Sequence, residues 1–326
     1  MPYQITIHVG TMGQGPFRSL DGGRTWQMGR GQVEAAVRSM AVFPNNPERL
    51  LAGADHALLA SDDNGESWEV VEGYKGGAQI WSITFDPSNP DTIFAGGHPG
   101  LRRSRDGGAT WEDLAIDIRH NAPAGIPRTT SVVIDPLDSR RIYAGIEVDG
   151  VHKSLDGGDT WSRGNPIGTE FFQQDVHHMG RAVGPEGAVM YATSPFGVAR
   201  SDDEGESWLQ HEFPRLRDGT LRLYSRGMLV KYDDPNTIFV AGGDDSPGIT
   251  GAIQRSTDGG RTWSPCELPY PPNSMFYWLA SHPEAPDTIA AATLHGYVYL
   301  SEDGGDSWRK LEREFGEIRA LVLSTA

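Results

Sequence analysis

One short pattern, Ser-x-Asp-x-Gly-x-Thr/Ser-Trp, recurs seven times along this chain of 326 residues. Its copies begin at Ser19, Ser61, Ser104, Ser154, Ser201, Ser256 and Ser301. Successive copies start 42 to 55 residues apart, which is about the length of a blade of four antiparallel strands. The repeat therefore predicts an all-β protein, a seven-bladed β-propeller.

The residue types in the pattern indicate a structural turn. An aspartate can accept hydrogen bonds from backbone N–H groups in a tight turn, and the glycine two places later can adopt a positive φ. The tryptophan is expected to pack against the neighbouring sheet. Seven carboxylates also invite a calcium interpretation, but one carboxylate per loop supplies too few ligands.

A second repeat predicts how the ring closes. Six of the seven patterns are preceded by a β-run and a turn, mostly Pro-rich, such as Asp86-Pro87-Ser88-Asn89-Pro90. Residues 4–10 read as a second strand with no first strand before it, and residues 317–324 read as a first strand with nothing after it. We expect the C-terminal strand to complete the N-terminal blade, which removes exposed sheet edges. A single domain over residues 1–326 follows.

These repeats are the Asp-box, and the whole chain resembles the BNR-repeat, or sialidase-like, propellers. The resemblance implies that the boxes are structural and that ligands bind on the opposite face, around the central channel. Sialidases use three arginines, a Tyr–Glu pair and an Asp acid, and this sequence lacks the N-terminal Arg-Ile-Pro motif. We therefore do not expect a true sialidase.

The composition of the chain excludes some classes of partner. The net charge of −16 opposes binding to nucleic acid or to an anionic membrane surface. Cys266 is the one cysteine, so no internal disulfide is required. The N-terminal residues show no signal peptide, and no apolar run is long enough to span a membrane. A cytoplasmic location is the expectation, and the oligomeric state is open.

Histidines and carboxylates gather in the loops that vary between blades. A divalent metal ion of unknown identity, or acid–base chemistry, would suit such a group. The candidate metal ligands are His56, His98, His177, His178 and His295. The alternative is that these are polar loop residues that contact water.

Arginines and acids suggest the rest of a site. Several arginines are candidates to bind a substrate carboxylate: Arg38, Arg128, Arg181, Arg222, Arg226 and Arg319. Four aromatic residues, Trp81, Tyr224, Tyr277 and Trp278, are candidates to stack on a sugar, although packing between blades is the more common role of such residues at strand starts. The catalytic candidates are Glu147, Asp244, His178, Arg38 and Arg226.

The sequence thus predicts a hydrolase or lyase that acts on a small polar substrate, anionic or sugar-like, in the central funnel. The alternative is a non-catalytic propeller that binds a protein partner.

Overall fold

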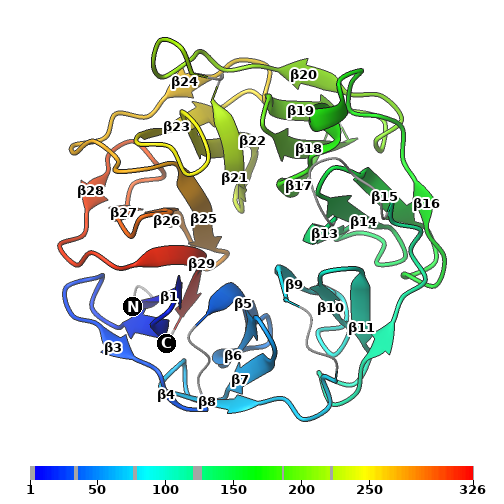
Figure 1. Ribbon diagram of the computed structural model, residues 1–326, viewed down its shortest axis with the longest axis vertical. Helices are drawn as coiled ribbons and strands as arrows, with labels where there is room; N and C mark the ends of the chain where they lie inside the picture. The colour runs from blue at the N-terminus through cyan, green and yellow to red at the C-terminus, as the bar shows by residue number, and fades with distance from the viewer. Residues whose placement is uncertain are drawn as a thin grey trace.

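The computed structural model describes residues 4–32, 36–75, 79–119, 127–185, 187–220 and 223–325. Seven sheets surround a central axis, with their strands following one another outward from it (Figure 1). The prediction of an all-β, seven-bladed propeller is confirmed.

Each blade runs from its innermost to its outermost strand in chain order, with blade 1 completed by the C-terminal strand. Blade 1 contains β29 (Glu317–Thr325), β1 (Ile5–Met12), β2 (Gly15–Ser19) and β3 (Gln27–Met28). Blade 2 contains β5 (Val37–Phe43), β6 (Asn46–Ala54), β7 (Leu58–Ser61) and β8 (Ser67–Val70), and blade 3 contains β9 (Ser82–Phe85), β10 (Ile93–Gly96), β11 (Leu101–Ser104) and β12 (Glu112–Asp113). Blade 4 contains β13 (Thr129–Ile134), β14 (Ile142–Ile146), β15 (Gly150–Ser154) and β16 (Ser162–Arg163).

The remaining blades repeat this order. Blade 5 contains β17 (His178–Gly184), β18 (Gly187–Ser194), β19 (Gly197–Ser201) and β20 (Leu209–His211), and blade 6 contains β21 (Tyr224–Lys231), β22 (Asp234–Gly243), β23 (Gly251–Ser256) and β24 (Ser264–Pro265). Blade 7 contains β25 (Phe276–His282), β26 (Ala285–Thr293), β27 (Val298–Ser301) and β28 (Arg309–Lys310). One departure from four strands is β4 (Arg30–Gly31), which pairs in parallel with β8.

Helical structure in the described residues is limited to the 3₁₀ turn η1 (Phe171–Gln174). Over the same residues, no helix has the length and apolar character needed to cross a membrane. The core is made of apolar layers between neighbouring blades, such as the layer of Phe43, Leu51 and Ile80 between blades 2 and 3.

The Asp-boxes form the turns that their residue types predict. In the first box, Asp21 accepts hydrogen bonds from the hydroxyls of Ser19 and Thr25 and from the Thr25 N–H, while Gly23 has a φ of +87°. The same aspartate contacts recur in all seven boxes. The carboxylate lone pairs are therefore used within the turn, which supports a structural role.

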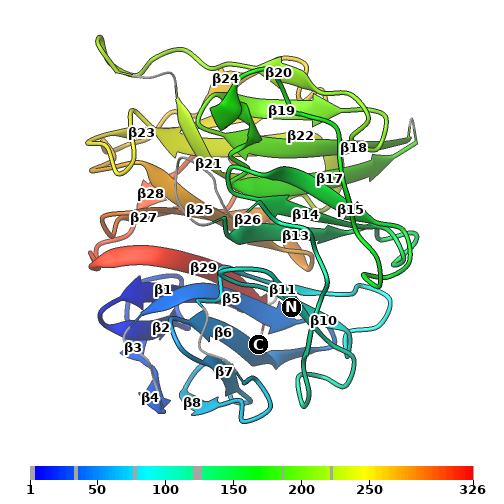
Figure 2. The same ribbon diagram turned by 45° about the vertical axis from the view of Figure 1, so that its right-hand side comes forward.

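The predicted ring closure is confirmed. β29 pairs antiparallel with β1 from Ile5↔Thr325 to Met12↔Glu317, and Figure 2 shows the two strands side by side. A buried polar cluster joins this pair to blade 2, because His8 Nε2 lies 2.8 Å from Ser324 Oγ and 3.1 Å from Asn64 Oδ1. The two chain ends are thus fastened to each other and to the next blade.

The buried His8 makes stability depend on pH. Burial is the main cause that lowers the pKa of His8, from 6.5 to about 3. As pH falls below 6.5, the unfolded chain takes up a proton that the folded chain refuses, so the free energy of unfolding decreases until about pH 3. Through His8, the free energy of unfolding is expected to fall by about 1.4 kcal/mol for each pH unit in this window.

Urea unfolding from neutral pH down to pH 4 measures this slope. The variant His8→Gln should make the slope of the free energy of unfolding against pH shallower. His56→Gln, at an exposed histidine, should leave this slope unchanged. Equal slopes in the wild type and in His8→Gln would show that His8 does not contribute to this loss of stability.

Candidate functional site

β-bulges direct side chains from the innermost strands into the mouth of the central funnel. A bulge adds one residue opposite its partner strand and changes the direction of a side chain. In four consecutive blades, 6, 7, 1 and 2, the added residue near the start of the innermost strand is Arg226, Tyr277, Arg319 and Arg38, respectively. In blade 4 the added residue is the buried Thr130, and Arg128 lies just before the strand instead.

The arginines form two groups around aromatic rings. The guanidinium carbons of Arg38 and Arg128 lie 4.7 and 4.5 Å from the centre of the Trp81 ring. Those of Arg226 and Arg319 both lie 4.7 Å from the centre of the Tyr277 ring. Cation–π contacts of this kind hold a charged side chain in place at low cost in entropy.

Glu147 joins the two groups. Its carboxylate lies 3.3 Å from Arg128 Nε and 3.4 Å from Arg226 Nη1, so two guanidinium groups share one carboxylate. At the outer ends, Arg38 pairs with Asp55 and Arg319 pairs with Glu317. We call Arg38, Trp81, Arg128, Glu147, Arg226, Tyr277 and Arg319 the funnel ring.

The arginines of the funnel ring shift the pKa of neighbouring groups, although the chain as a whole is strongly acidic. Burial alone would raise the pKa of the Tyr277 hydroxyl, yet Arg226 and Arg319 outweigh it and lower that pKa. Burial and then Arg128 lower the pKa of His98. Both groups therefore sense the arginine charge, and an anion would be stabilised in the same place.

Arg226 is the most enclosed of these arginines. It is buried, and its Nη2 donates a hydrogen bond of 2.8 Å to the Tyr277 hydroxyl. Burial would lower its pKa, but Tyr277 and Glu147 outweigh that effect and raise it, so the guanidinium stays charged.

Blade 5 adds a polar array of different chemistry. His177 Nδ1 donates to the Ser225 carbonyl at 2.7 Å, which fixes a proton on that nitrogen. Its Nε2 lies 3.1 Å from the Tyr224 hydroxyl and 3.4 Å from Asp175 Oδ2. In the neutral histidine this Nε2 carries a lone pair that accepts from Tyr224, and the protonated form can instead donate to Asp175. The array can therefore accept and pass on a proton.

His178 points to a different environment from its neighbour. Its ring stacks on Trp278 with centroids 4.9 Å apart, and its Nδ1 accepts a hydrogen bond of 3.3 Å from the Met228 N–H. Burial and then Arg226 lower its pKa to about 4, so it is neutral at neutral pH.

The five predicted metal ligands do not form a shared site. No three or more His, Cys, Asp or Glu side chains lie together so as to hold a metal ion anywhere in the described parts of the chain. All five histidines belong to those parts; His56 and His295 are exposed, and His177 is buried among the hydrogen bonds given above. Among the described residues these five histidines are therefore not gathered into a metal site, and their role as metal ligands stays a prediction. Binding of a metal elsewhere stays a prediction for metal analysis of the purified protein.

The catalytic candidates separate into two sets. Arg38, Glu147, Arg226 and, one layer deeper, His178 lie at the funnel. Asp244 is instead fully buried in its own loop, where it accepts from the Ile249 and Thr250 N–H groups and pairs with Arg217. Its contacts are those of a loop anchor, so we no longer assign it to the site.

Other expectations change with the side-chain positions. Arg181 pairs with Asp135 and Glu204 outside the funnel ring, and Arg222 lies outside the described residues. Trp81 and Tyr277 are buried under arginines, so neither ring offers a face to a sugar.

The pairing of the two arginine–aromatic groups through Glu147 was not foreseen from the sequence. A signal does exist in three innermost strands, where an arginine is followed by a small residue and then by Met or Leu. The three segments are Arg38-Ser39-Met40, Arg226-Gly227-Met228 and Arg319-Ala320-Leu321.

Comparisons with known proteins find partial similarity to several of them. A family model described as Sortilin-Vps10 (sortilin, neurotensin receptor 3) matches residues 197–321. A probable oligoxyloglucan-reducing end-specific xyloglucanase of Neosartorya fischeri is 24% identical over 212 residues, which are 55% of this chain and 26% of that protein. The chain thus spans about a quarter of the length of this curated relative.

Solved structures share the fold at low identity. The GH74 xyloglucanase from Xanthomonas campestris superposes with a TM-score of 0.69 and 19% identity, over 94% of this chain and 52% of that one. YCF48 from Cyanidioschyzon merolae gives 0.63 and 16%, over 92% and 98%. A structure of YCF48 bound to D1 peptide gives 0.60 and 19%, over 93% and 91%. The fold is therefore shared with an enzyme and with YCF48, a propeller of this chain's own size.

Proposed function

We propose that the funnel ring binds an anionic ligand through a carboxylate group. The observation that supports this most is the sharing of Glu147 by Arg128 and the buried Arg226. Glu147 alone cannot neutralise two guanidinium groups, and Asp175, the other carboxylate that senses the charge of Arg226, is already engaged with His177. Buried charge without full compensation is costly. A ligand carboxylate would supply the missing charge, and guanidinium groups are well suited to carboxylate geometry.

A small molecule is the ligand we favour. Arg128 and Arg319 have side chains that are 37% and 23% exposed, whereas the rest of the funnel ring is more enclosed. The two more exposed arginines could contact a small anionic group from solvent, while the more enclosed residues are held by their own contacts.

Calorimetric titration with acetate and succinate at constant ionic strength tests the proposal. We expect saturable binding of both carboxylates and no binding of tetramethylammonium, which carries the opposite charge. Heats that do not differ between carboxylates and sodium chloride would overturn the proposal.

Turnover is a second candidate, and the contacts of His177 with Tyr224 and Asp175 favour it. A hydrolase or lyase needs a group that moves a proton beside the bound substrate. Asp175 and Arg226 are close enough for the arginine to help lower the Asp175 pKa against the effect of burial, so the array borders the funnel ring. Hydrolysis of the p-nitrophenyl hemi-ester of succinate would be expected to fall in Tyr224→Phe while succinate binding persists. Equal rates in both proteins would remove this candidate.

Capture of a protein partner is the remaining candidate. YCF48 matches over nearly the whole of both chains, and one of its structures has a peptide bound, whereas the xyloglucanase matches over only half of its longer chain. This difference favours capture of a protein partner. In that case the carboxylate would belong to a peptide, and short free carboxylates would compete with it.

A further inference from the structure

We propose that the ligand of the funnel ring carries an apolar chain, which lies in the central cavity beneath the ring. This inference rests on the proposed carboxylate site and adds the class of ligand: a monocarboxylate with an apolar body.

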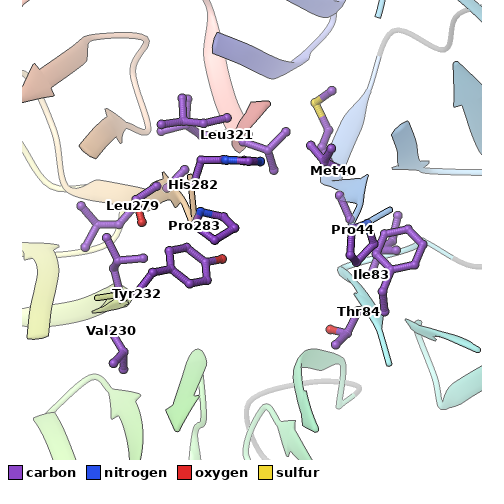
Figure 3. Close-up of a pocket in the computed structure, with 18 of the residues that line it drawn as sticks. Met40, Pro44, Ile83, Thr84, Val230, Tyr232, Leu279, His282, Pro283 and Leu321 are labelled. Carbon is purple, nitrogen blue, oxygen red and sulfur yellow. The ribbon is translucent and has the colours of Figure 1, made fainter. Parts of the chain in front are cut away.

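A cavity of about 910 Å³ occupies the centre of the propeller. Figure 3 shows Met40, Pro44 and Ile83 on one side of it, across from Leu279 and Pro283 on the other. It reaches the turns between the first and second strands at one end, and His178 and Trp278 at the other. This volume is within the range of small-molecule sites.

The cavity begins directly below the funnel ring. Two residues after Arg38, Arg226, Tyr277 and Arg319 on the same strands come four apolar residues that line the cavity: Met40, Met228, Leu279 and Leu321. Two residues along a strand correspond to roughly 7 Å. Tyr277, in the ring, and Trp278, in the cavity wall, have stacked rings with centroids 6.4 Å apart. A molecule held at the ring by its carboxylate would therefore need a chain of several methylenes to reach the cavity.

The walls favour an apolar occupant. Several polar side chains along the cavity already have partners: Thr84 donates to the Val132 carbonyl, Glu284 accepts from Thr325, and Arg181 is paired with acids. Met40, Met179 and Met228 supply flexible, polarisable surface that adapts to different shapes.

His178 and Trp278 line the end of the cavity that is nearer to the funnel ring. Because its pKa is lowered to about 4, His178 is uncharged at neutral pH, and its stacked ring offers an apolar face. An uncharged lining lets an apolar chain pass without desolvating an ion.

A series of carboxylates of increasing length tests the inference: acetate, butanoate, hexanoate and octanoate, titrated by calorimetry into the intact protein. We expect affinity to rise about fourfold for each methylene that enters the cavity. Octylammonium has the same chain with the opposite charge and should not bind.

Two variants separate the cavity from the ring. Ile83→Trp fills the cavity and should bind acetate as the wild type does, while losing the gain from octanoate. Val230→Glu places a charge on the same wall and should act in the same way if Ile83→Trp does not fold. Both residues line the cavity and lie outside the funnel ring.

The outcomes distinguish the two claims. Acetate binding with no dependence on chain length would overturn the apolar-chain inference and leave the carboxylate site standing. A gain with chain length that persists in both variants would also overturn it. Failure of every carboxylate to bind would overturn the carboxylate site and with it this inference.

Discussion

Removal of residues 317–326 is expected to abolish the cooperative fold of the whole ring. These residues form β29, which supplies the innermost strand of blade 1 and buries Ile318, Leu321 and Leu323. Each such side chain contributes about 1.5–3 kcal/mol by burial, and together with the lost strand pairing this approaches the 5–15 kcal/mol that keeps a typical domain folded. The deletion also exposes the edge of β1 and removes Ser324 from His8.

Circular dichroism with thermal unfolding measures this effect, and a circular permutant is the matched control. Because Thr325 pairs with Ile5, residues 317–325 can be placed before residue 4 through a short turn, which restores an ordinary hairpin. The permutant should unfold cooperatively, as the wild type does. A truncated protein with an unchanged melting transition would contradict the closure account.

Loss of one funnel-ring arginine is expected to weaken carboxylate binding by about 30-fold or more. A buried, hydrogen-bonded charge pair that loses one partner costs about 2–5 kcal/mol, and each 1.4 kcal/mol is a factor of ten. Arg319→Gln is the preferred variant, because the Arg319 side chain is partly exposed and the fold should tolerate its loss. Arg226→Gln should have the larger effect on binding, but Arg226 is buried, so its loss also lowers the stability of the fold.

A second measurement distinguishes weaker binding from unfolding. Arg319 helps to lower the pKa of Tyr277, so Arg319→Gln should raise that pKa, as followed by the ultraviolet absorbance of the phenolate. Arg140→Gln, at a side chain that is 75% exposed and paired with Asp138 in the turn between β13 and β14, is the matched control and should change neither value. Unchanged succinate affinity in a folded Arg319→Gln protein would contradict the role of this arginine.

The scaffold could be predicted from sequence because its determinants are local. Each Asp-box closes with contacts from the aspartate to residues two before and up to four after it, so the repeat alone specifies the turn. The count of boxes against preceding turns likewise indicated the closure that Ile5↔Thr325 pairing confirms.

The site was harder to predict, because side-chain direction depends on backbone details that spacing does not carry. Arg38 and Arg226 were candidates from the sequence, but the bulges that place them in the funnel ring could not be read from it. His56 and His295 occupy comparable loops and end exposed. Asp244 lies in a loop of the expected kind, but its carboxylate accepts hydrogen bonds from the Ile249 and Thr250 N–H groups of that loop.

The most direct test of the carboxylate site is a crystal structure of the protein with acetate bound. The account predicts the acetate oxygens at about 3 Å from guanidinium nitrogens of the funnel ring, between Arg128, Arg226 and Arg319. Acetate that binds elsewhere on the surface, with Glu147 and water alone contacting these arginines, would contradict it.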